Sequence, residues 1–235
     1  MGTADLHIHT IYSYDGTATV PAVLERAQQV GLDLIAITDH DQIRGALQAE
    51  QLAPKFGIQV IPGVEITTAE GDLLALAIQK IVPAGLSLIE TVRRVGEQGG
   101  FCIAPHPGAS GFGMKSLSTA SIAQALRSPE IRRILLGVET DNATSLDHPH
   151  NLSAKIWARQ LDVAQTGSSD AHVLEAIGLG ATLFPGKTVL DLIAALWMGT
   201  TRVRKSPEWS TTRVLGTWMT NYLLSAPAHL RLAWA

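Results

Sequence analysis

The opening segment DLHIH, residues 5–9, constrains the fold of this 235-residue chain more than any other feature. Alternate side chains of a β-strand point to opposite faces, so Asp5, His7 and His9 are predicted to share one face, opposite Leu6 and Ile8. Burying ionisable groups is costly unless they are paired or bind a metal. The segment therefore predicts either a metal site or a core strand whose buried ionisable groups cost folding free energy.

Short apolar runs alternate with helical patterns along the chain. Strands are predicted at 5–9, 32–38, 59–67, 73–81, 100–105, 134–140 and 161–167, and helices at 21–30, 43–56, 87–98, 119–126, 151–160 and 189–197. This alternation is typical of a mostly parallel sheet or a barrel. Seven strands favour a slightly irregular α/β barrel, and 46% apolar residues suffice for one large core.

Residues 202–235 break the alternation and include Trp209, Trp218 and Trp234. Packing on the barrel, oligomerisation and contact with a membrane surface all remain open for this segment. Residues 214–230 lack formal charges, but their polar side chains argue against a membrane span.

Composition limits the cellular compartment and the kinds of partner that we expect for this protein. Cys102 is the only cysteine, and no signal-peptide pattern is visible, so we expect a cytoplasmic protein. The net charge of −3 gives no reason to expect an extended nucleic-acid surface.

Ionisable side chains gather where the predicted strands end. They are His7, His9, Asp15, Asp39, His40, Glu65, His106, Asp170 and His172. In α/β barrels this edge holds the active site. Mixed imidazole and carboxylate ligands suit Mn, Zn or Fe better than Mg, and the set is too large for one tetrahedral ion. We therefore predict two or three divalent ions.

Each of these residues also has an ordinary structural interpretation when it is taken alone. Strand histidines can be satisfied by hydrogen bonds, Asp39 can cap a helix, and His106 can be a loop residue before Pro107. The coincidence at one barrel edge favours a site instead. Glu139 ends the sixth strand at the same edge, where it would support a ligand or bind substrate. Lys115 and Arg44 are candidate phosphate contacts, although solvated positions are the more common role of such residues.

The motifs D-x-H-x-H-T, T-D-H-D, G-V-E, H-P and G-S-x-D-A-H occur in this order between Asp5 and about Phe184. Together they resemble the PHP family, named for polymerase and histidinol phosphatase. The resemblance implies a metal-dependent phosphoesterase with a single-domain, distorted (β/α)7 TIM-like barrel. From the break in the alternation we place this domain at residues 1–201, followed by an extension of unknown role at 202–235. Because no polymerase domain is attached, we expect a stand-alone member.

The resemblance also implies how the ions are held. One ion would take His7, His9, Glu65 and Asp170, a second Glu65 and His106, and a third Asp15, His40 and His172. Asp72 stands where many relatives have a histidine, so its coordination of the second ion is open. Asp39 would orient a ligand or assist proton transfer, and His40 or His172 would protonate the leaving group. A water bridging two cations would be the nucleophile.

The expected substrate is a small phosphorylated molecule or a short oligonucleotide. Two alternatives stay open. Amidohydrolase barrels, which cleave C–N or lactone bonds, also open with H-x-H, but they commonly use a bridging lysine where this chain has Glu65. A PHP-like module that binds metal without turnover would show an incomplete ligand set, and only Asp72 is irregular here.

Overall fold

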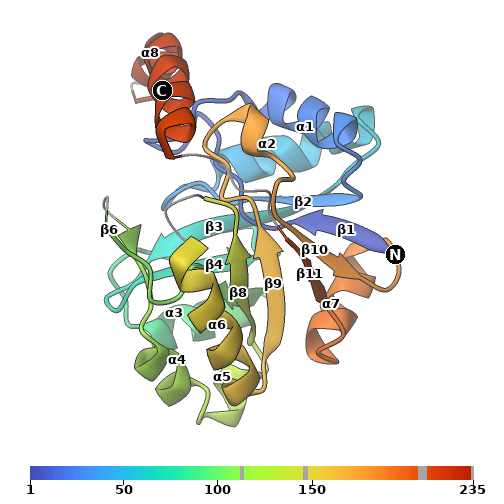
Figure 1. Ribbon diagram of the computed structural model, residues 1–235, viewed down its shortest axis with the longest axis vertical. Coiled ribbons are helices and arrows are strands. Elements are labelled where there is room, and N and C mark those ends of the chain that lie inside the picture. Colours follow the sequence, from blue (N-terminus) through green and yellow to red (C-terminus); the bar gives the residue numbers. More distant parts are fainter. Residues whose placement is uncertain (112–113, 145–147, 206–210, 234–235) are drawn as a thin grey trace.

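The computed structural model describes residues 1–111, 114–144, 148–205 and 211–233. Its centre is a nine-stranded sheet in the order β11-β10-β1-β2-β3-β4-β5-β8-β9 (Figure 1). The strands are β1 (Gly2–Asp5), β2 (Leu34–Ile37), β3 (Gln59–Thr67), β4 (Asp72–Leu76), β5 (Phe101–Ala104), β8 (Leu135–Asn142), β9 (Ala164–Ser168), β10 (Ala181–Phe184) and β11 (Arg202–Arg204), with a separate hairpin of β6 (Ser110–Gly111) and β7 (Met114–Lys115).

Helices surround this sheet. They are α1 (Val20–Gln29), α2 (Arg44–Leu52), α3 (Leu88–Glu97), α4 (Thr119–Ala125), α5 (Pro129–Arg132), α6 (His148–Leu161), α7 (Val189–Trp197) and α8 (Thr211–Ala233), with 3-10 turns at Ala53–Lys55 and Leu174–Ala176. Capping residues in the sequence set where several of these helices begin. Ser87, for example, caps α3 by accepting a hydrogen bond from the Glu90 amide at 3.3 Å.

The sheet curls until its two ends meet. The Gly167 amide of β9 donates to Thr182 Oγ1 of β10 at 3.0 Å, and Thr201 Oγ1 donates to the Gln165 carbonyl at 2.8 Å. Gly167 permits this approach, because a Cβ there would lie 2.8 Å from Val203. The predicted single-domain, barrel-like α/β fold is therefore confirmed, while the predicted boundary at residue 201 stays a prediction.

Strand direction differs from the expected, mostly parallel sheet. The pairs β1–β2, β2–β3, β5–β8 and β8–β9 are parallel, but β3–β4, β4–β5, β1–β10 and β10–β11 are antiparallel. The connection between β3 and β4 is a tight turn, which only an antiparallel pair can use. The opening strand is also displaced: β1 ends at Asp5, and Ile8 keeps a single parallel bridge, to Ala171.

Both faces of the sheet are buried. In β2, Leu34 and Ala36 pack inside the barrel with Phe184, whereas Ile35 and Ile37 belong to the layer under the outer helices. Leu192 of α7 joins the interior cluster near the strand starts, so α7 closes the N-terminal end of the barrel. The opposite end, where the strands finish, is left for polar side chains.

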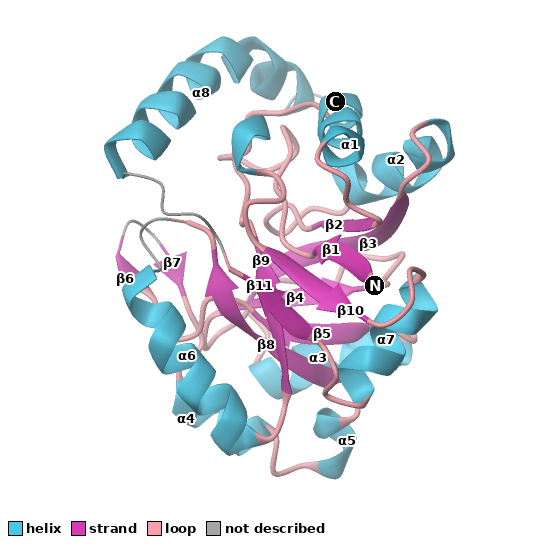
Figure 2. Ribbon diagram, turned by 45° about the vertical axis from the view of Figure 1, so that its right-hand side comes forward, coloured by secondary structure: helices cyan, strands magenta, loops and turns pink. Residues whose placement is uncertain are grey.

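The C-terminal segment forms the long helix α8. Figure 1 places α8 at the upper end of the molecule, far from α3, α4 and α5 at the lower end, and Figure 2 shows it arching across the top. In the part of the chain that the structure describes, no helix is long and apolar enough to cross a membrane. Trp218 lies within α8, whereas Trp209 and Trp234 fall outside the described residues.

Candidate metal centre

The ends of the parallel strands bring the predicted ligands together. His7 and His9 follow β1, His40 follows β2, Glu65 lies in β3, His106 follows β5, and Asp170 and His172 follow β9. Backbone pairing sets their relative positions, because His40 bridges Glu65 in parallel register and Ile8 bridges Ala171. Side chains more than a hundred residues apart in the chain thus share one end of the barrel.

Glu65 lies at the centre of the group. Its Oε2 is 3.0 Å from His7 Nε2, 3.3 Å from His9 Nε2 and 3.4 Å from His40 Nδ1. Its Oε1 is 3.2 Å from His106 Nε2. One buried carboxylate therefore contacts four imidazoles that come from three different loops.

The candidate ligands form three overlapping sets. Within each set, the nitrogen and oxygen atoms that could bind a metal all lie within 4.8 Å of one another. They are His9, Asp15, His40 and His172; His7, Glu65 and His106; and His7, His9 and Asp170. These sets contain every predicted ligand except Asp72. Their division resembles the three-ion arrangement expected from sequence.

The chemistry of these atoms fits divalent cations. His9 Nε2 is buried and makes no hydrogen bond among the described residues, yet it lies 3.2 Å from Asp170 Oδ1 and 3.3 Å from Glu65 Oε2. Atoms that face one another at this distance without hydrogen-bond geometry are arranged as ligands around a common centre would be. Imidazole and carboxylate donors of this kind suit Zn, Mn or Fe.

Electrostatics inside the cluster is strongly coupled. Burial alone raises the pKa of Glu65 and Asp170, but the facing histidines hold both values well below their usual range. Burial alone lowers the pKa of His7, yet Asp170 and Glu65 raise it well above its usual value. Without metal, protons on imidazole balance the carboxylates, and cations would displace those protons.

His172 has a defined tautomer. Its Nδ1 lies 2.9 Å from the Asp170 carbonyl oxygen, which only accepts hydrogen bonds, so Nδ1 carries the proton. In the neutral ring Nε2 then carries no proton, and its lone pair can bind a metal ion. This atom lies 3.2 Å from Asp15 Oδ2. This is the tautomer that a metal ligand requires.

Glu139 and Asn142 support the candidate ligands, and of these two residues the sequence indicated only Glu139. Glu139 accepts hydrogen bonds from the His106 amide and from Asn142 Nδ2, both at 2.9 Å, and its Oε1 lies 3.4 Å from His7 Nδ1. Asn142 also donates to Asp170 Oδ2 at 3.2 Å. Asn142 carried no sequence signal, because its role depends on where β8 ends relative to β9.

Two of the candidate ligands lie on strained backbone. His106 and Asp170 have φ values of 28° and 50°, in the left-handed region that non-glycine residues rarely adopt. Such strain persists only where the surroundings enforce it, and it clusters at functional sites. Here it turns the chain sharply after β5 and after β9, and both side chains return to the barrel end.

Asp39 does not take part in the ligand sets. Both of its oxygens are taken up by Thr10: Oδ1 accepts from the amide at 2.6 Å, and Oδ2 accepts from the hydroxyl at 2.8 Å. Burial, the largest effect, raises the pKa of Asp39 to about 6. Gly45 allows this arrangement, because a Cβ there would lie 2.1 Å from Asp39 Oδ2. The Asp39 side chain thus holds the loop after β1, while its backbone carbonyl accepts a hydrogen bond from the Glu65 amide at 3.3 Å.

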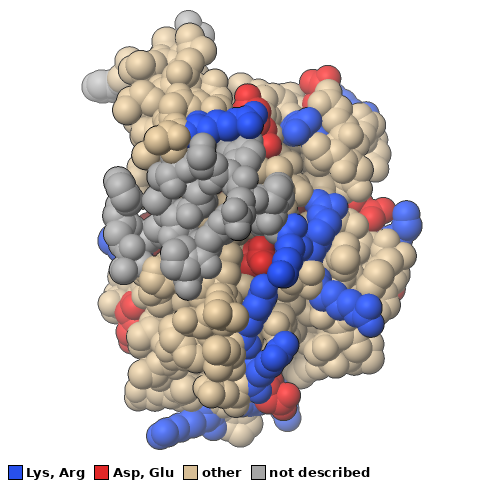
Figure 3. Space-filling model, in the orientation of Figure 1, with Lys and Arg blue, Asp and Glu red and all other residues tan. Residues whose placement is uncertain are grey.

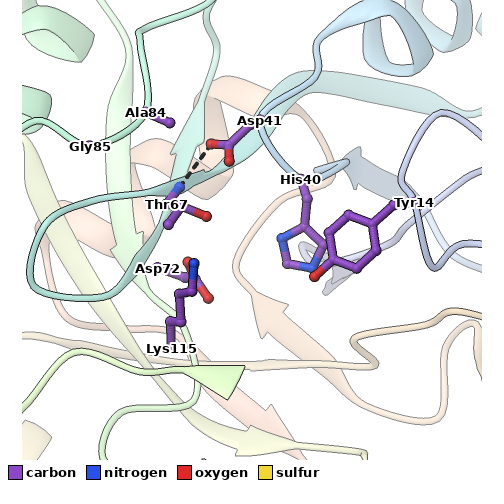
Figure 4. Close-up of a pocket in the computed structure, with 8 residues that line it drawn as sticks. All are labelled: Tyr14, His40, Asp41, Thr67, Asp72, Ala84, Gly85 and Lys115. Carbon is purple, nitrogen blue, oxygen red and sulfur yellow. Dashed lines mark hydrogen bonds between the residues drawn. The ribbon is translucent and has the colours of Figure 1, made fainter. Parts of the chain in front are cut away.

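Asp72 lies beside the cluster, outside the three described sets. It is buried, its Oδ1 has no hydrogen-bond partner among the described residues, and burial followed by the nearby Glu65 raises its pKa to about 6. It lines a cavity of about 450 Å³ together with His40, Tyr14 and Lys115 (Figure 4). Arg44, the other cation considered, lies over the Tyr12 ring at 5.5 Å.

Family comparison matches this chain in two segments. The PHP domain family matches residues 5–90, and the family described as PHP-associated matches residues 148–201. The uncharacterised protein MJ1587 of Methanocaldococcus jannaschii is 41% identical over 114 residues, which cover 44% of this chain and 67% of that protein. The phosphoribosyl 1,2-cyclic phosphate 1,2-diphosphodiesterase of Eggerthella lenta is 35% identical over 86 residues, 34% of this chain and only 32% of that enzyme.

A solved structure shares the fold. It is a protein of Bifidobacterium adolescentis, provisionally described as a metal-dependent phosphoesterase, with 19% identity and a TM-score of 0.59 over 72% of this chain and 87% of the other. Both segments of family similarity include residues of the cluster: His7, His9, Asp15, His40 and Glu65 in the first, and Asp170 and His172 in the second. On the fold, the motifs and these matches, the chain belongs to the PHP family.

Proposed function

We propose that this protein is a metal-dependent phosphoesterase that uses two or three divalent ions. The observation that carries the proposal is the single buried carboxylate of Glu65, which lies within 3.4 Å of four imidazoles at the C-terminal end of the barrel. When bound, the ions would supply Lewis-acid stabilisation of phosphate charge and activation of water at neutral pH. The names of relatives that act on phosphodiesters support this choice.

The chain's own residues have distinct proposed roles. His7, His9, Glu65 and Asp170 would hold the buried ion or ions, with His106 sharing Glu65. Asp15, His40 and His172 would form the outer part of the centre, where side chains are 15–26% exposed. His40 also lines the cavity, so when it is not bound to an outer ion it is the histidine we assign to protonate the leaving oxygen. We assign Asp39 to positioning and keep Asp72 as an optional ligand.

The cavity indicates the size and charge of the substrate. Its volume of about 450 Å³ lies in the range of small-molecule sites, and its lining residues include the cation of Lys115 as well as Asp41 and Asp72. Figure 3 shows Lys and Arg side chains in an interrupted band over one face, a distribution that the net charge of −3 does not reveal. A small phosphorylated molecule and a short oligonucleotide both remain proposed substrates.

Substitution of ligands tests the proposal. We expect His9→Ala and Asp170→Asn to lose bound metal and most hydrolysis of p-nitrophenyl phosphate or bis-p-nitrophenyl phosphate, assayed with Mn²⁺, Zn²⁺, Fe²⁺ and Mg²⁺. Elemental analysis of the purified protein reports the identity and number of ions. Full turnover with unchanged metal content in either variant would refute the assignment.

The same assay separates the competing hydrolase class. The residue that approaches four imidazoles here is the carboxylate Glu65, whereas amidohydrolase barrels commonly use a bridging lysine. Amide and lactone substrates tested beside phosphoesters therefore provide the comparison. Metal-dependent turnover of amides or lactones without phosphoester hydrolysis would replace the proposal.

A further inference from the structure

The outer part of the metal centre depends on a turn. Asp15 lies in the irregular segment between β1 and α1, and its Oδ2 is 3.3 Å from His40 Nε2 and 3.2 Å from His172 Nε2. The other ligands of this set follow strands of the barrel. Asp15 is thus the ligand whose position the sheet determines least.

Contacts inside the barrel fix only parts of this turn. Ser13 Oγ donates to Asp15 Oδ1 at 2.7 Å, and the Thr17 amide and hydroxyl donate to the His172 carbonyl at 3.1 and 2.7 Å. Thr17 anchors the end of the turn, and Ser13 orients the carboxylate. Neither contact holds the backbone of Asp15 itself.

Helix α8 supplies that missing contact. Trp218 Nε1 donates to the Asp15 backbone carbonyl at 2.8 Å, across 203 positions of sequence. The Trp218 ring stacks on Tyr222 with centroids 5.0 Å apart, so the donor is itself braced within the helix. In Figure 2 the helix arches over the end of the molecule, and this bond connects it to the turn.

We propose that Trp218 is a positioning residue for the metal centre, through which α8 holds the Asp15 turn in its ligating conformation. The inference rests on the proposed function, because it concerns the same centre. A turn that is already ordered loses less conformational entropy when an ion binds. The helix therefore strengthens binding of the ion that uses Asp15, while ions held by His7, Glu65 and Asp170 are unaffected.

Trp218→Phe tests this directly, because phenylalanine retains an aromatic ring for Tyr222 and lacks the donor. Mn²⁺ or Zn²⁺ titration after chelation, with elemental analysis, would resolve the weaker and tighter sites. Loss of one hydrogen bond predicts that the ion held by Asp15, identified by its loss in Asp15→Asn, binds about three- to tenfold less tightly, with the other ions unchanged. Trp197→Phe is the matched control, since Trp197 is an exposed residue of α7.

A second measurement needs no metal. In the chelated protein, Trp218→Phe should accelerate hydrogen exchange in the peptide that spans residues 10–18, and Trp197→Phe should not. Adding Asp15→Asn to Trp218→Phe should weaken the outer ion no further than Asp15→Asn alone. Unchanged binding of every ion in Trp218→Phe, or an equal loss at all of them, overturns the inference. A parent protein that binds no metal overturns the proposed function as well.

Discussion

Glu65→Gln is the most informative change at the centre, because it keeps the shape of the side chain and removes one charge. The carboxylate approaches four histidines at 3.0–3.4 Å, so any ion in the buried part of the cluster would lie close to it. Two unit charges 4 Å apart interact by about 4 kcal/mol at an effective dielectric constant of 20, and each 1.4 kcal/mol is tenfold in affinity. For a divalent ion this interaction is about 8 kcal/mol, so if relaxation offsets about two thirds of it, about 2.7 kcal/mol remains and we expect affinity to fall about 100-fold.

Thermal unfolding converts this loss into a measurable quantity. At a metal concentration of 100 times the parent dissociation constant, one ion stabilises the parent by about 2.7 kcal/mol and a 100-fold weaker variant by about 0.4 kcal/mol. For a chain of this size, 1 kcal/mol shifts Tm by about 2–4 °C. The parent should therefore gain several degrees on addition of Mn²⁺ or Zn²⁺, and the variant about one.

Glu25→Gln provides the control, because Glu25 is exposed on α1 and undergoes the same change in charge. It should retain the full metal-induced shift and the full phosphoesterase activity. Elemental analysis after dialysis reports the ion count in all three proteins. If Glu65→Gln is folded and gains the same Tm shift and the same metal content as the parent, the reasoning about a shared carboxylate is wrong.

Two further predictions concern stability. Burial alone lowers the pKa of His40 and His172, but nearby carboxylates raise these values to about 9 and about 10, above the unfolded value of about 6.5. The contribution of these two histidines to the free energy of unfolding is complete below pH 6.5 and is lost as the pH rises through 9 and 10. The Tm measured in EDTA should therefore fall over that pH range. A Tm that rises there would contradict the prediction. Gly45→Ala should destabilise the fold by about 1–3 kcal/mol in urea unfolding, because the added Cβ would overlap Asp39. Gly216→Ala is the control, since a Cβ there has no neighbouring atom within 4 Å, and it should not destabilise the fold. Equal stability of the two variants would exclude the overlap.

Much of the candidate site followed from sequence, because its residues belong to short motifs at strand ends. The alternation of His7 and His9 around Ile8 is a local property, and the parallel register of the barrel brings such strand ends to one edge. Glu139 was recognised for the same reason, since it lies near the end of a strand.

Other features depend on contacts between distant segments. The sequence placed Asp39 beside a ligand, but only the structure shows that Thr10 occupies both of its oxygens. Asn142 bonds to Glu139 and Asp170 from the end of β8, and no local pattern distinguishes it from a surface asparagine. Asp72 has a motif position near a ligand, yet its side chain lies beside the cluster rather than in a described set.

By itself, the sequence determined the apolar runs and the motif residues, because each depends on spacing over a few positions. Tertiary structure decided the antiparallel direction of β4 and β10, the approach of β9 to β10, and the contact of Trp218 with Asp15. These features depend on which segments pack against one another, and the free energy of such long-range contacts is distributed over the whole chain. One carboxylate facing four imidazoles is therefore a property of the closed barrel, although each residue was visible in the sequence.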